Sequence, residues 1–278
     1  MKRKLRIRIY LTAVVIILGA AFGLLRIVPS LRPPYLAHYF LNALPKEAFV
    51  KKVVDGDTIE LLDGSMVRYI GIDTPEMSFK RADKWEHKPQ RYAVEATLLN
   101  QKLVEGKKVR FEYDTVKKDR YRRILAYVYA DNLFINGEMV KQGYAYTFNF
   151  PPNVRYAEVF AQYQDEAQKN CRGIWSNKDQ IISSDEAYRY IGAIKTIKGK
   201  IMRVTKTPKV IYLNFGADYK KDFTIVIFKR NFKEFAKLSN DLAGVYQNKT
   251  VSITGKIKEY NGPEIIAHSP ADIRILEK

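Results

Sequence analysis

Residues 49–76 read FVKKVVDGDTIELLDGSMVRYIGIDTPE, and this stretch decides the fold. β-Branched and apolar residues alternate with polar ones over 49–62 and again over 66–72, which is typical of strands with one buried face. The pair Asp63-Gly64 between the two runs is a hairpin-turn composition. The stretch therefore predicts two adjacent antiparallel strands near the start of a domain.

The pattern beyond this hairpin changes to helix. Residues 92–104 place Ala93, Ala96 and Leu99 at helical spacing and end at Glu105-Gly106, which favours a helix end. Two strands and two further helices are then expected, at 108–113, 124–129, 136–143 and 155–170. With a third strand before the first helix, this order predicts a five-stranded barrel with helices packed on it.

The same order of elements begins again at residue 191, without a sequence repeat. Strands are expected at 193–204, 210–215 and 222–228, a helical stretch at 231–242, and strands at 250–258 and 264–275. Three strands, a helix and two strands again describe an OB fold. We therefore expect a mainly β protein with helices (α+β), with one barrel domain over 48–177, a linker over 178–190 and a second OB-fold domain over 191–278.

The N-terminal segment predicts a membrane helix. Residues 1–8 are basic and residues 9–25 carry no charge, the layout of a signal peptide or a short anchor. We favour an uncleaved anchor within 1–28, because no small-residue cleavage site follows the apolar run, and a Pro-containing linker over 29–47. Basic residues before the span place the remainder outside the cytoplasm, anchored in the cell membrane by about residues 9–28. Secretion after signal cleavage is the alternative.

The charge balance indicates a polyanionic partner. The chain of 278 residues has 48 Lys and Arg against 30 Asp and Glu. A body this basic attracts nucleic acid or an anionic membrane surface, although solubility alone is a competing explanation. The single cysteine, Cys171, excludes an intrachain disulfide, and no Cys/His cluster has the spacing of a zinc site.

Two acidic motifs accompany the first hairpin, DGDT at residues 55–58 and DTPE at residues 73–76. Each taken singly is an ordinary turn sequence, because Asp, Gly, Thr and Pro all favour turns. If the two segments are neighbours, however, Asp57, Asp73 and the Thr74 carbonyl converge on one hard cation, since calcium and magnesium prefer carboxylate and carbonyl oxygens.

Arginines occur beside these acids. Arg68 precedes Asp73 on the same expected strand, and the run DRYRR at residues 119–123 opens the strand that continues as ILAY. A cation, a carboxylate base and two arginines together indicate hydrolysis of a phosphate ester.

The segments VDGDT, VRYIGIDTPE, DRYRRILAYVYA, NGEMVKQGYA and RGIW resemble the successive signature segments of staphylococcal nucleases, or thermonucleases. The resemblance covers residues 49–175 and implies an OB barrel with flanking helices. The implied function is a calcium-dependent endonuclease that hydrolyses phosphodiester bonds of DNA and possible RNA substrates by in-line attack of water. Arg122 stands where the family often has glycine, and the 77–91 loop differs in length and composition, so substrate preference stays open.

The resemblance also implies a role for each site residue. Calcium would be held by Asp57, Asp73 and the Thr74 carbonyl, with Asp55 as an outer-shell acceptor. Glu76 matches the general base, and Arg68 and Arg123 match the two arginines that donate to the phosphate oxygens. Arg120 and Tyr121 are expected to contact the substrate, whereas His87 is expected to be a solvated loop residue.

The second barrel resembles nucleic-acid-binding OB modules in its pattern. Aromatic residues beside basic ones favour single-strand binding, although most aromatics of a small barrel belong to its core. The aromatic candidates are Tyr212, Phe215, Phe223, Phe228 and Tyr260, and the basic ones are Lys200, Arg203, Lys206, Lys209, Lys256 and Lys258. The alternative function is therefore a catalytically silent, membrane-anchored nucleic-acid-binding protein with two OB barrels. The sequence indicates no obligate protein partner and leaves the oligomeric state open.

Overall fold

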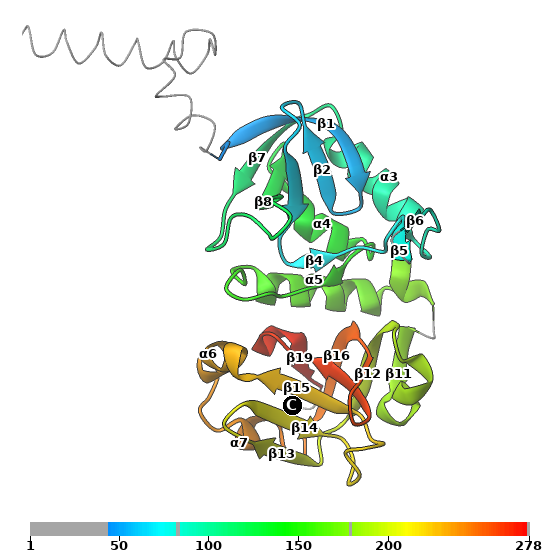
Figure 1. The fold of residues 1–278 in the computed structure, drawn as a ribbon, viewed down its shortest axis with the longest axis vertical. Helices are drawn as coiled ribbons and strands as arrows, with labels where there is room; N and C mark the ends of the chain where they lie inside the picture. Colours follow the sequence, from blue (N-terminus) through cyan, green and yellow to red (C-terminus); the bar gives the residue numbers. More distant parts are fainter. Residues whose placement is uncertain (1–43, 82–83, 178–179, 277–278) are drawn as a thin grey trace, which may run out of the picture. The chain divides into compact units, whose positions relative to one another are not determined.

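A computed structural model describes residues 44–81, 84–177 and 180–276. Residues Lys46–Lys278 belong to one compact unit, and this unit contains two β-barrels with helices between and around their strands (Figure 1). Within the described ranges, no helix has the length and apolar character needed to cross a membrane. The anchor expected within 1–28 lies outside the described residues, as does most of the linker expected over 29–47.

The first barrel is closed by a parallel strand pair. Its strands follow the order β3-β2-β1-β7-β8, and β3 also pairs with β8, so the sheet has no free edge there. The strands are β1 (Glu47–Asp55), β2 (Thr58–Leu61), β3 (Met66–Tyr69), β7 (Lys108–Glu112) and β8 (Ile124–Ala130), with the short β9 (Leu133–Phe134) beyond β8. The five-stranded barrel predicted from the sequence is therefore confirmed.

Helices cover this barrel and short strands complete it. The helices are α3 (Ala93–Val104), α4 (Ile135–Lys141), α5 (Ala157–Lys169) and the 3-10 turn η2 (Gly173–Ser176). The short strands are β4 (Ile72–Asp73), which pairs with β10 (Tyr146–Thr147), and β5 (Phe79–Arg81), which pairs with β6 (Lys84–Glu86). The helix expected over 92–104 is confirmed almost to the residue.

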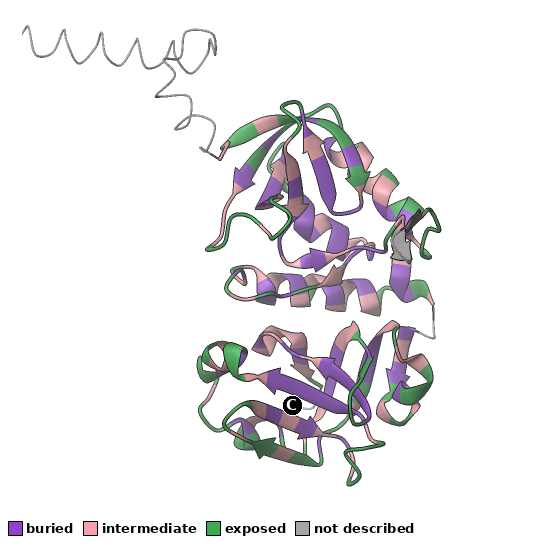
Figure 2. Ribbon diagram, in the orientation of Figure 1, coloured by how far each residue is buried: buried purple, intermediate pink, exposed green. Residues whose placement is uncertain are grey.

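The buried side of the first barrel follows from strand alternation. Val67 and Tyr69 of β3 are buried, as are Ile59 and Leu61 of β2, and the interior strands appear as buried segments in Figure 2. Side chains two positions apart along a strand point to the same face, so one set fills the core and the other reaches solvent. Arg68, between two buried residues, is thereby directed away from the core.

The single strand expected over 49–62 is in fact two strands, β1 and β2, joined by a tight turn at Gly56 and Asp57. The Asp57 amide donates to the Asp55 carboxylate at 3.0 Å, which is the side-chain bond of an Asx turn. A Cβ on Gly56 would come within 2.8 Å of the Thr74 side chain. The turn therefore brings the first acidic motif against the second.

The second barrel is built in the same order. One sheet runs β11-β12-β16-β19 and the other β13-β14-β15-β18-β17, with β15 and β18 parallel. Its strands are β11 (Ile181–Ser183), β12 (Ile194–Lys200), β13 (Arg203–Lys206), β14 (Val210–Asn214), β15 (Thr224–Phe228), β16 (Thr250–Lys256), β17 (Lys258–Glu259), β18 (Pro263–Ile266) and β19 (Ile273–Ile275). The helical parts are η4 (Ser184–Tyr190), η5 (Lys229–Asn231), α6 (Phe232–Ala236), α7 (Leu242–Tyr246) and η6 (Pro270–Asp272).

The linker expected over 178–190 is wrong for its described part. Residues Ile181–Ser183 form β11, which pairs in parallel with β12, and η4 follows directly. Ile182 and Ala187 belong to the hydrophobic core of the second barrel. Burial of these two apolar side chains outweighs the polar composition that suggested a linker.

Candidate active site

The predicted catalytic residues come from three segments of the first barrel. Asp55 ends β1, Asp57 lies in the turn before β2, and Arg68 lies in β3. Arg123 directly precedes β8, and Arg68 is the register partner of Leu125 in the parallel β3–β8 pair. The closure of the barrel therefore places the two arginines near each other, and both line a pocket of about 610 Å³.

Asp57 is held by the second acidic motif. One of its carboxylate oxygens, Oδ2, accepts from the Thr74 amide at 2.9 Å and from the Thr74 hydroxyl at 3.0 Å. The other, Oδ1, accepts from the Thr58 hydroxyl at 3.1 Å. Asp57 and Thr74 are both buried, so these bonds fix the carboxylate in one orientation.

Arg68 joins the two acids that were predicted to share a cation. Its Nη2 donates to Oδ1 of Asp73 at 2.7 Å, and its Nη1 lies against Oδ2 of Asp57. The Arg68 side chain is only 15% exposed, so the contacts are partly shielded from water. One guanidinium therefore contacts both Asp57 and Asp73, and their sharing of a cation stays a prediction.

Burial shifts the acids of the site toward the neutral form. It raises the pKa of Asp55 and of Asp73, and the positive charge of Arg68 opposes the shift in both. Glu76 is exposed, yet partial desolvation and then the charges of Asp55 and Asp73 raise its pKa as well. Desolvation is the main cause in all three, and the positive charge of Arg68 offsets only part of it.

A tight turn positions Arg123. The Arg123 amide and the Tyr121 amide both donate to Oδ1 of Asp119 at 2.9 Å, and the Arg123 Nε donates to Oδ2 of Asp119 at 2.7 Å. Arg122 lies between them with φ 67°, in the left-handed region that favours glycine. Glycine would adopt this conformation without the steric cost that Arg122 bears.

Aromatic rings border the pocket beside the arginines. The Arg120 guanidinium lies 4.7 Å and that of Arg123 5.6 Å from the centre of the Tyr121 ring, which is 65% exposed. Phe148 and Phe150 also line the pocket and are largely exposed. The sequence analysis identified Tyr121 but missed both phenylalanines, for which only their unusual FNFPP context could have been a signal.

Hard oxygen donors suit a divalent cation at this place. Carboxylate oxygens of Asp57 and Asp73 are close enough to be joined by one guanidinium, and oxygen ligands of this kind favour calcium or magnesium. Among the described residues, His, Cys, Asp and Glu do not form a metal-binding group of three or more. A site with two carboxylates and the Thr74 carbonyl is compatible with that result, because only two of its ligands are of those types.

His87 lies apart from these groups. It is exposed, and its Nδ1 is 3.2 Å from the Ser78 hydroxyl. The structure places it in a loop contact rather than among the acids and arginines, as the sequence led us to expect.

Comparison with known proteins identifies the family. Residues 66–177 match the family model described as "Staphylococcal nuclease homologue". A thermonuclease from Staphylococcus hyicus is 38% identical over 147 residues, which are 52% of this chain and 84% of that protein. The chain belongs to the staphylococcal nuclease family. It is a hydrolase that cleaves phosphodiester bonds, and its substrates are nucleic acids.

Two further relatives support the assignment. A thermonuclease from Staphylococcus intermedius is 40% identical over 129 residues, 45% of this chain and 74% of that protein. The endonuclease YncB of Bacillus subtilis is 32% identical over 135 residues, 47% of this chain and 62% of that protein. All three alignments span about half of the present chain, which is close to the length of its first barrel.

Proposed function

We propose that this chain is a calcium-dependent endonuclease that hydrolyses DNA, and RNA in addition, at the pocket of its first barrel. The observation that carries the proposal is the bridge from Arg68 to both Asp57 and Asp73. It brings two carboxylates able to hold a cation and a guanidinium able to bind phosphate together, and Arg68 and Arg123 line one pocket beside them. Phosphodiester hydrolysis needs this combination of groups.

Asp57, Asp73 and the Thr74 carbonyl would hold the cation directly. Asp55 would not bind the cation itself but would accept hydrogen bonds from groups around it. When bound, calcium would offset the negative charge that grows on the phosphoryl oxygens. Calcium suits a mixed set of carboxylate and carbonyl oxygens, because it accepts irregular geometry better than magnesium does.

The protein's own side chains carry the remaining steps. Glu76 accepts a proton from the attacking water, and its raised pKa makes it a better base than an ordinary carboxylate at neutral pH. Arg123 uses Nε for Asp119, so its two Nη groups remain to donate to the phosphoryl oxygens. The P–O bond opposite the attacking oxygen breaks, and the leaving oxygen takes a proton from solvent.

Substrate contacts come from the exposed rings and Arg120. Tyr121, whose ring lies under two guanidinium groups, offers a flat face at the edge of the pocket. Bases of an unpaired strand can stack on such a face, and Arg120 can pair with a phosphate.

We also propose the domain division and location expected from the sequence, with one change. The nuclease domain covers about 48–177, and the second domain begins at β11 rather than at residue 191, because β11 joins its sheet. Anchoring in the cell membrane by about residues 9–28, with both barrels outside the cytoplasm, is supported by the basic flank and uncharged run of the N-terminus.

The deciding experiment measures cleavage of single-stranded DNA, duplex DNA and RNA with calcium, with magnesium and with chelator. We expect calcium-dependent cleavage, and Glu76→Gln and Arg123→Ala each should lower kcat by about 10²-fold or more, the scale of a lost transition-state donor. Arg110→Ala, which removes an exposed arginine of β7, is the matched control and should keep the wild-type rate. DNA binding without cleavage under every condition would favour the silent two-barrel binding protein instead.

A further inference from the structure

The second barrel has a pocket of about 520 Å³ on the outer face of its five-stranded sheet. Strand alternation separates this face from the core. Arg203 and Thr205 of β13 line the pocket, whereas Val204 and Lys206 line a different pocket on the other side of the strand. The volume is in the range of sites for small molecules or single nucleotides.

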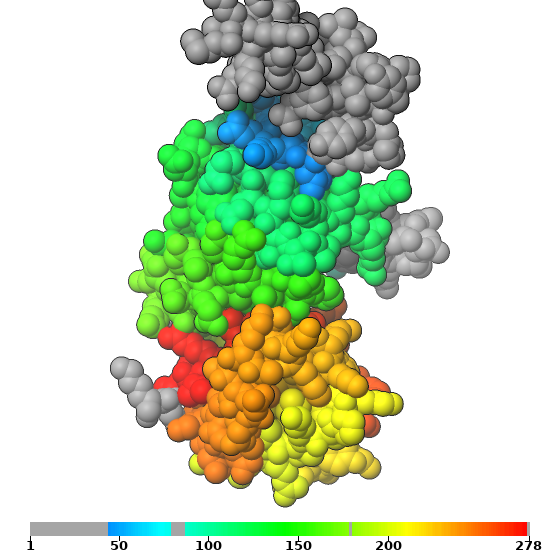
Figure 3. Space-filling view, turned by 90° about the vertical axis from the view of Figure 1, so that its left-hand side faces the viewer, coloured from blue at the N-terminus to red at the C-terminus, as the bar shows by residue number. Residues whose placement is uncertain are grey.

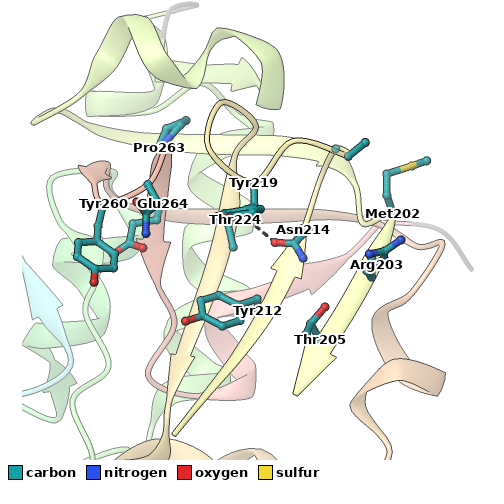
Figure 4. Close-up of a pocket in the computed structure, with 14 residues that line it drawn as sticks. Met202, Arg203, Thr205, Tyr212, Asn214, Tyr219, Thr224, Tyr260, Pro263 and Glu264 are labelled. Carbon is teal, nitrogen blue, oxygen red and sulfur yellow. Dashed lines mark hydrogen bonds between the residues drawn. The ribbon is translucent and has the colours of Figure 1, made fainter. Parts of the chain in front are cut away.

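A polar row crosses the sheet inside this pocket. The strand register places Arg203 opposite Asn214, Asn214 opposite Thr224, Thr224 opposite Glu264, and Glu264 opposite Lys258. The Thr224 hydroxyl donates to Oδ1 of Asn214 at 3.2 Å, which leaves the Asn214 amide group as a donor toward the pocket. Within the pocket the row thus has a cation, Arg203, at one end and a donor and an acceptor beyond it (Figure 4). Lys258, which pairs with Glu264 in the sheet, lies outside the pocket lining.

Three tyrosine rings accompany the polar row. Tyr212 rises from β14 in the middle of the sheet, and Tyr260 stands at one end beside Glu264 (Figure 4). Tyr260 is 72% and Tyr219 56% exposed, so both hold aromatic surface in water. Single hydrophobic residues at a surface need no explanation, but rings gathered around one pocket indicate a ligand.

The two loops that carry the exposed tyrosines approach each other closely at a glycine. Gly262 has φ 105°, and a Cβ on it would lie 2.9 Å from the Tyr219 carbonyl oxygen. Only glycine allows this close approach of the β14–β15 loop to the β17–β18 turn. The loops that bear Tyr219 and Tyr260 are therefore in contact and form one wall of the pocket.

The charge of the second barrel selects the class of ligand. Residues 191–278 contain 17 Lys and Arg against eight Asp and Glu. Its yellow and orange residues form a continuous surface in the space-filling view (Figure 3). A neutral oligosaccharide or a basic peptide would gain nothing from this excess, whereas a polyanion gains by counterion release.

We propose that this pocket, formed by Tyr212, Tyr219, Tyr260, Asn214 and Arg203, binds single-stranded nucleic acid. One unpaired base stacks on the tyrosine rings, with its polar edge toward Asn214 and Glu264, and the strand's phosphates pass Arg203 and Lys258. A carboxylate such as Glu264 accepts from the amino groups of bases. A duplex does not fit the proposal, because its bases are not free to stack on side chains.

Two of the five aromatic residues considered from the sequence, Phe215 and Phe223, do not line the proposed binding pocket. Both are buried in the core, with ring centres 4.9 Å apart. Phe228 does not line the pocket; the Arg230 guanidinium lies 5.4 Å from its ring centre. Tyr219 and Asn214, which no sequence pattern singled out, take their place.

Binding is tested on the full chain with chelator present and in a Glu76→Gln background, so that cleavage does not remove the probe. The probe is a fluorescein-labelled oligonucleotide of about 12 nucleotides, within the site size of one OB fold, as a single strand and as a duplex. Fluorescence anisotropy at several salt concentrations gives the Kd. The double variant Tyr219→Ala/Tyr260→Ala removes the rings, and Tyr219→Phe/Tyr260→Phe keeps their faces.

The alanine pair should weaken single-strand binding by roughly five- to a hundredfold, the scale of lost stacking, while the phenylalanine pair stays close to wild type. Arg203→Ala should weaken binding and lower its dependence on salt, whereas Arg230→Ala, an exposed arginine outside the pocket, should change neither by a comparable amount.

Unchanged single-strand affinity in Tyr219→Ala/Tyr260→Ala would overturn the proposal, and so would an equal loss for single strand and duplex. Binding of neutral oligosaccharides that disappears in the same variant, without an effect on nucleic acid, would assign the pocket to sugars and also overturn it. Because the readout is binding without cleavage, the result does not depend on whether the first barrel proves to be calcium-dependent.

Discussion

The position of Arg68 shows how much depends on the shape of one side chain. It reaches Asp73 through Nη2 and Asp57 through Nη1, which a single planar fork can do and a point charge cannot. The same fork is suited to two oxygens of a phosphate. The residue that organises the acids is thus also equipped to bind the group that is attacked.

Arg68→Lys should therefore lower kcat by about 10²-fold although the charge is kept. The measurement is steady-state cleavage of DNA with calcium, with near-ultraviolet circular dichroism to show that the barrel is still folded. Arg110→Lys is the control for arginine-to-lysine exchange on an exposed strand position. A rate within a factor of about three of wild type would show that only charge matters at this position.

At the scale of secondary-structure elements, α4 is attached to the barrel through one buried amide. The Asn136 Oδ1 accepts from the Val128 amide at 2.9 Å, and its Nδ2 donates to the Ile70 carbonyl at 2.9 Å. Asn136 is fully buried. It therefore satisfies backbone groups of β8 and of the segment after β3, the two strands that close the barrel.

Asn136→Ala should destabilise the protein by about 2–3 kcal/mol, because it leaves two buried backbone groups without partners. Chemical denaturation followed by circular dichroism measures the change. Asn132→Ala, in the exposed turn before α4, tests a surface asparagine that also has a positive φ of 66°. If Asn136→Ala lowers the unfolding free energy no more than Asn132→Ala does, the buried amide has no special role in stability.

Sequence reasoning predicted elements well where periodicity and end signals agree. The helix at Ala93–Val104 and the strand at β8 are such cases. It failed at Gly56 and Asp57, because apolar residues continue on both sides of the turn and hide it. It failed again at β11, where two isoleucines within a polar stretch pair with a distant strand, a long-range contact that no local window contains.

The acidic and arginine residues could be selected from the sequence because their motifs are local, and their catalytic roles stay a prediction. The placement of Arg68 and Arg123 at one pocket could not be predicted, since it arises only through the β3–β8 pair. In the second barrel, the sequence pattern identified aromatic residues but not the face of the sheet on which each one lies. Tyr212 and Phe215 are three positions apart, so alternation places them on opposite faces of a strand, but only the structure shows that Tyr212 lines a pocket and Phe215 the core.

At the scale of the whole molecule, the two barrels touch through the aromatic segment beside the candidate active site. The His268 ring lies 5.6 Å from the Phe150 ring and 6.2 Å from the Phe148 ring. The Asn149 side-chain amide donates to Oδ1 of Asp272 at 2.7 Å. The segment that borders the nuclease pocket is thus held by residues of the second barrel.

This contact should make the stability sensitive to acid. Burial, assisted by the charges of Arg230 and Lys258, lowers the pKa of His268 to about 4. In the unfolded chain histidine takes up a proton below about pH 6.5, so the unfolded state binds more protons between these values and stability falls as the pH decreases. Asp272, which accepts from the His268 amide, has a raised pKa and acts in the opposite direction.

His268→Asn isolates the histidine contribution, because Asp272 is present in both proteins. Between pH 7 and pH 5 the wild type should lose about 1 kcal/mol more unfolding free energy than the variant, after allowance for partial solvent exposure. Denaturant titrations at both pH values measure this difference. The control variant His87→Asn should lose as much unfolding free energy between pH 7 and pH 5 as the wild type does, since His87 is an exposed loop residue. An equal loss in wild type and His268→Asn would show that His268 does not cause the acid sensitivity.

The parallel pairing of β3 with β8 also has a kinetic meaning. The strands are joined through more than fifty intervening residues, so their association requires the closure of a long loop, and contacts of this kind form slowly. The arginines share a pocket only after that step. Recovery of phosphodiesterase activity during refolding would therefore report the closure of the barrel, and should lag behind the return of helix signal, because the backbone hydrogen bonds of a helix such as α3 are local.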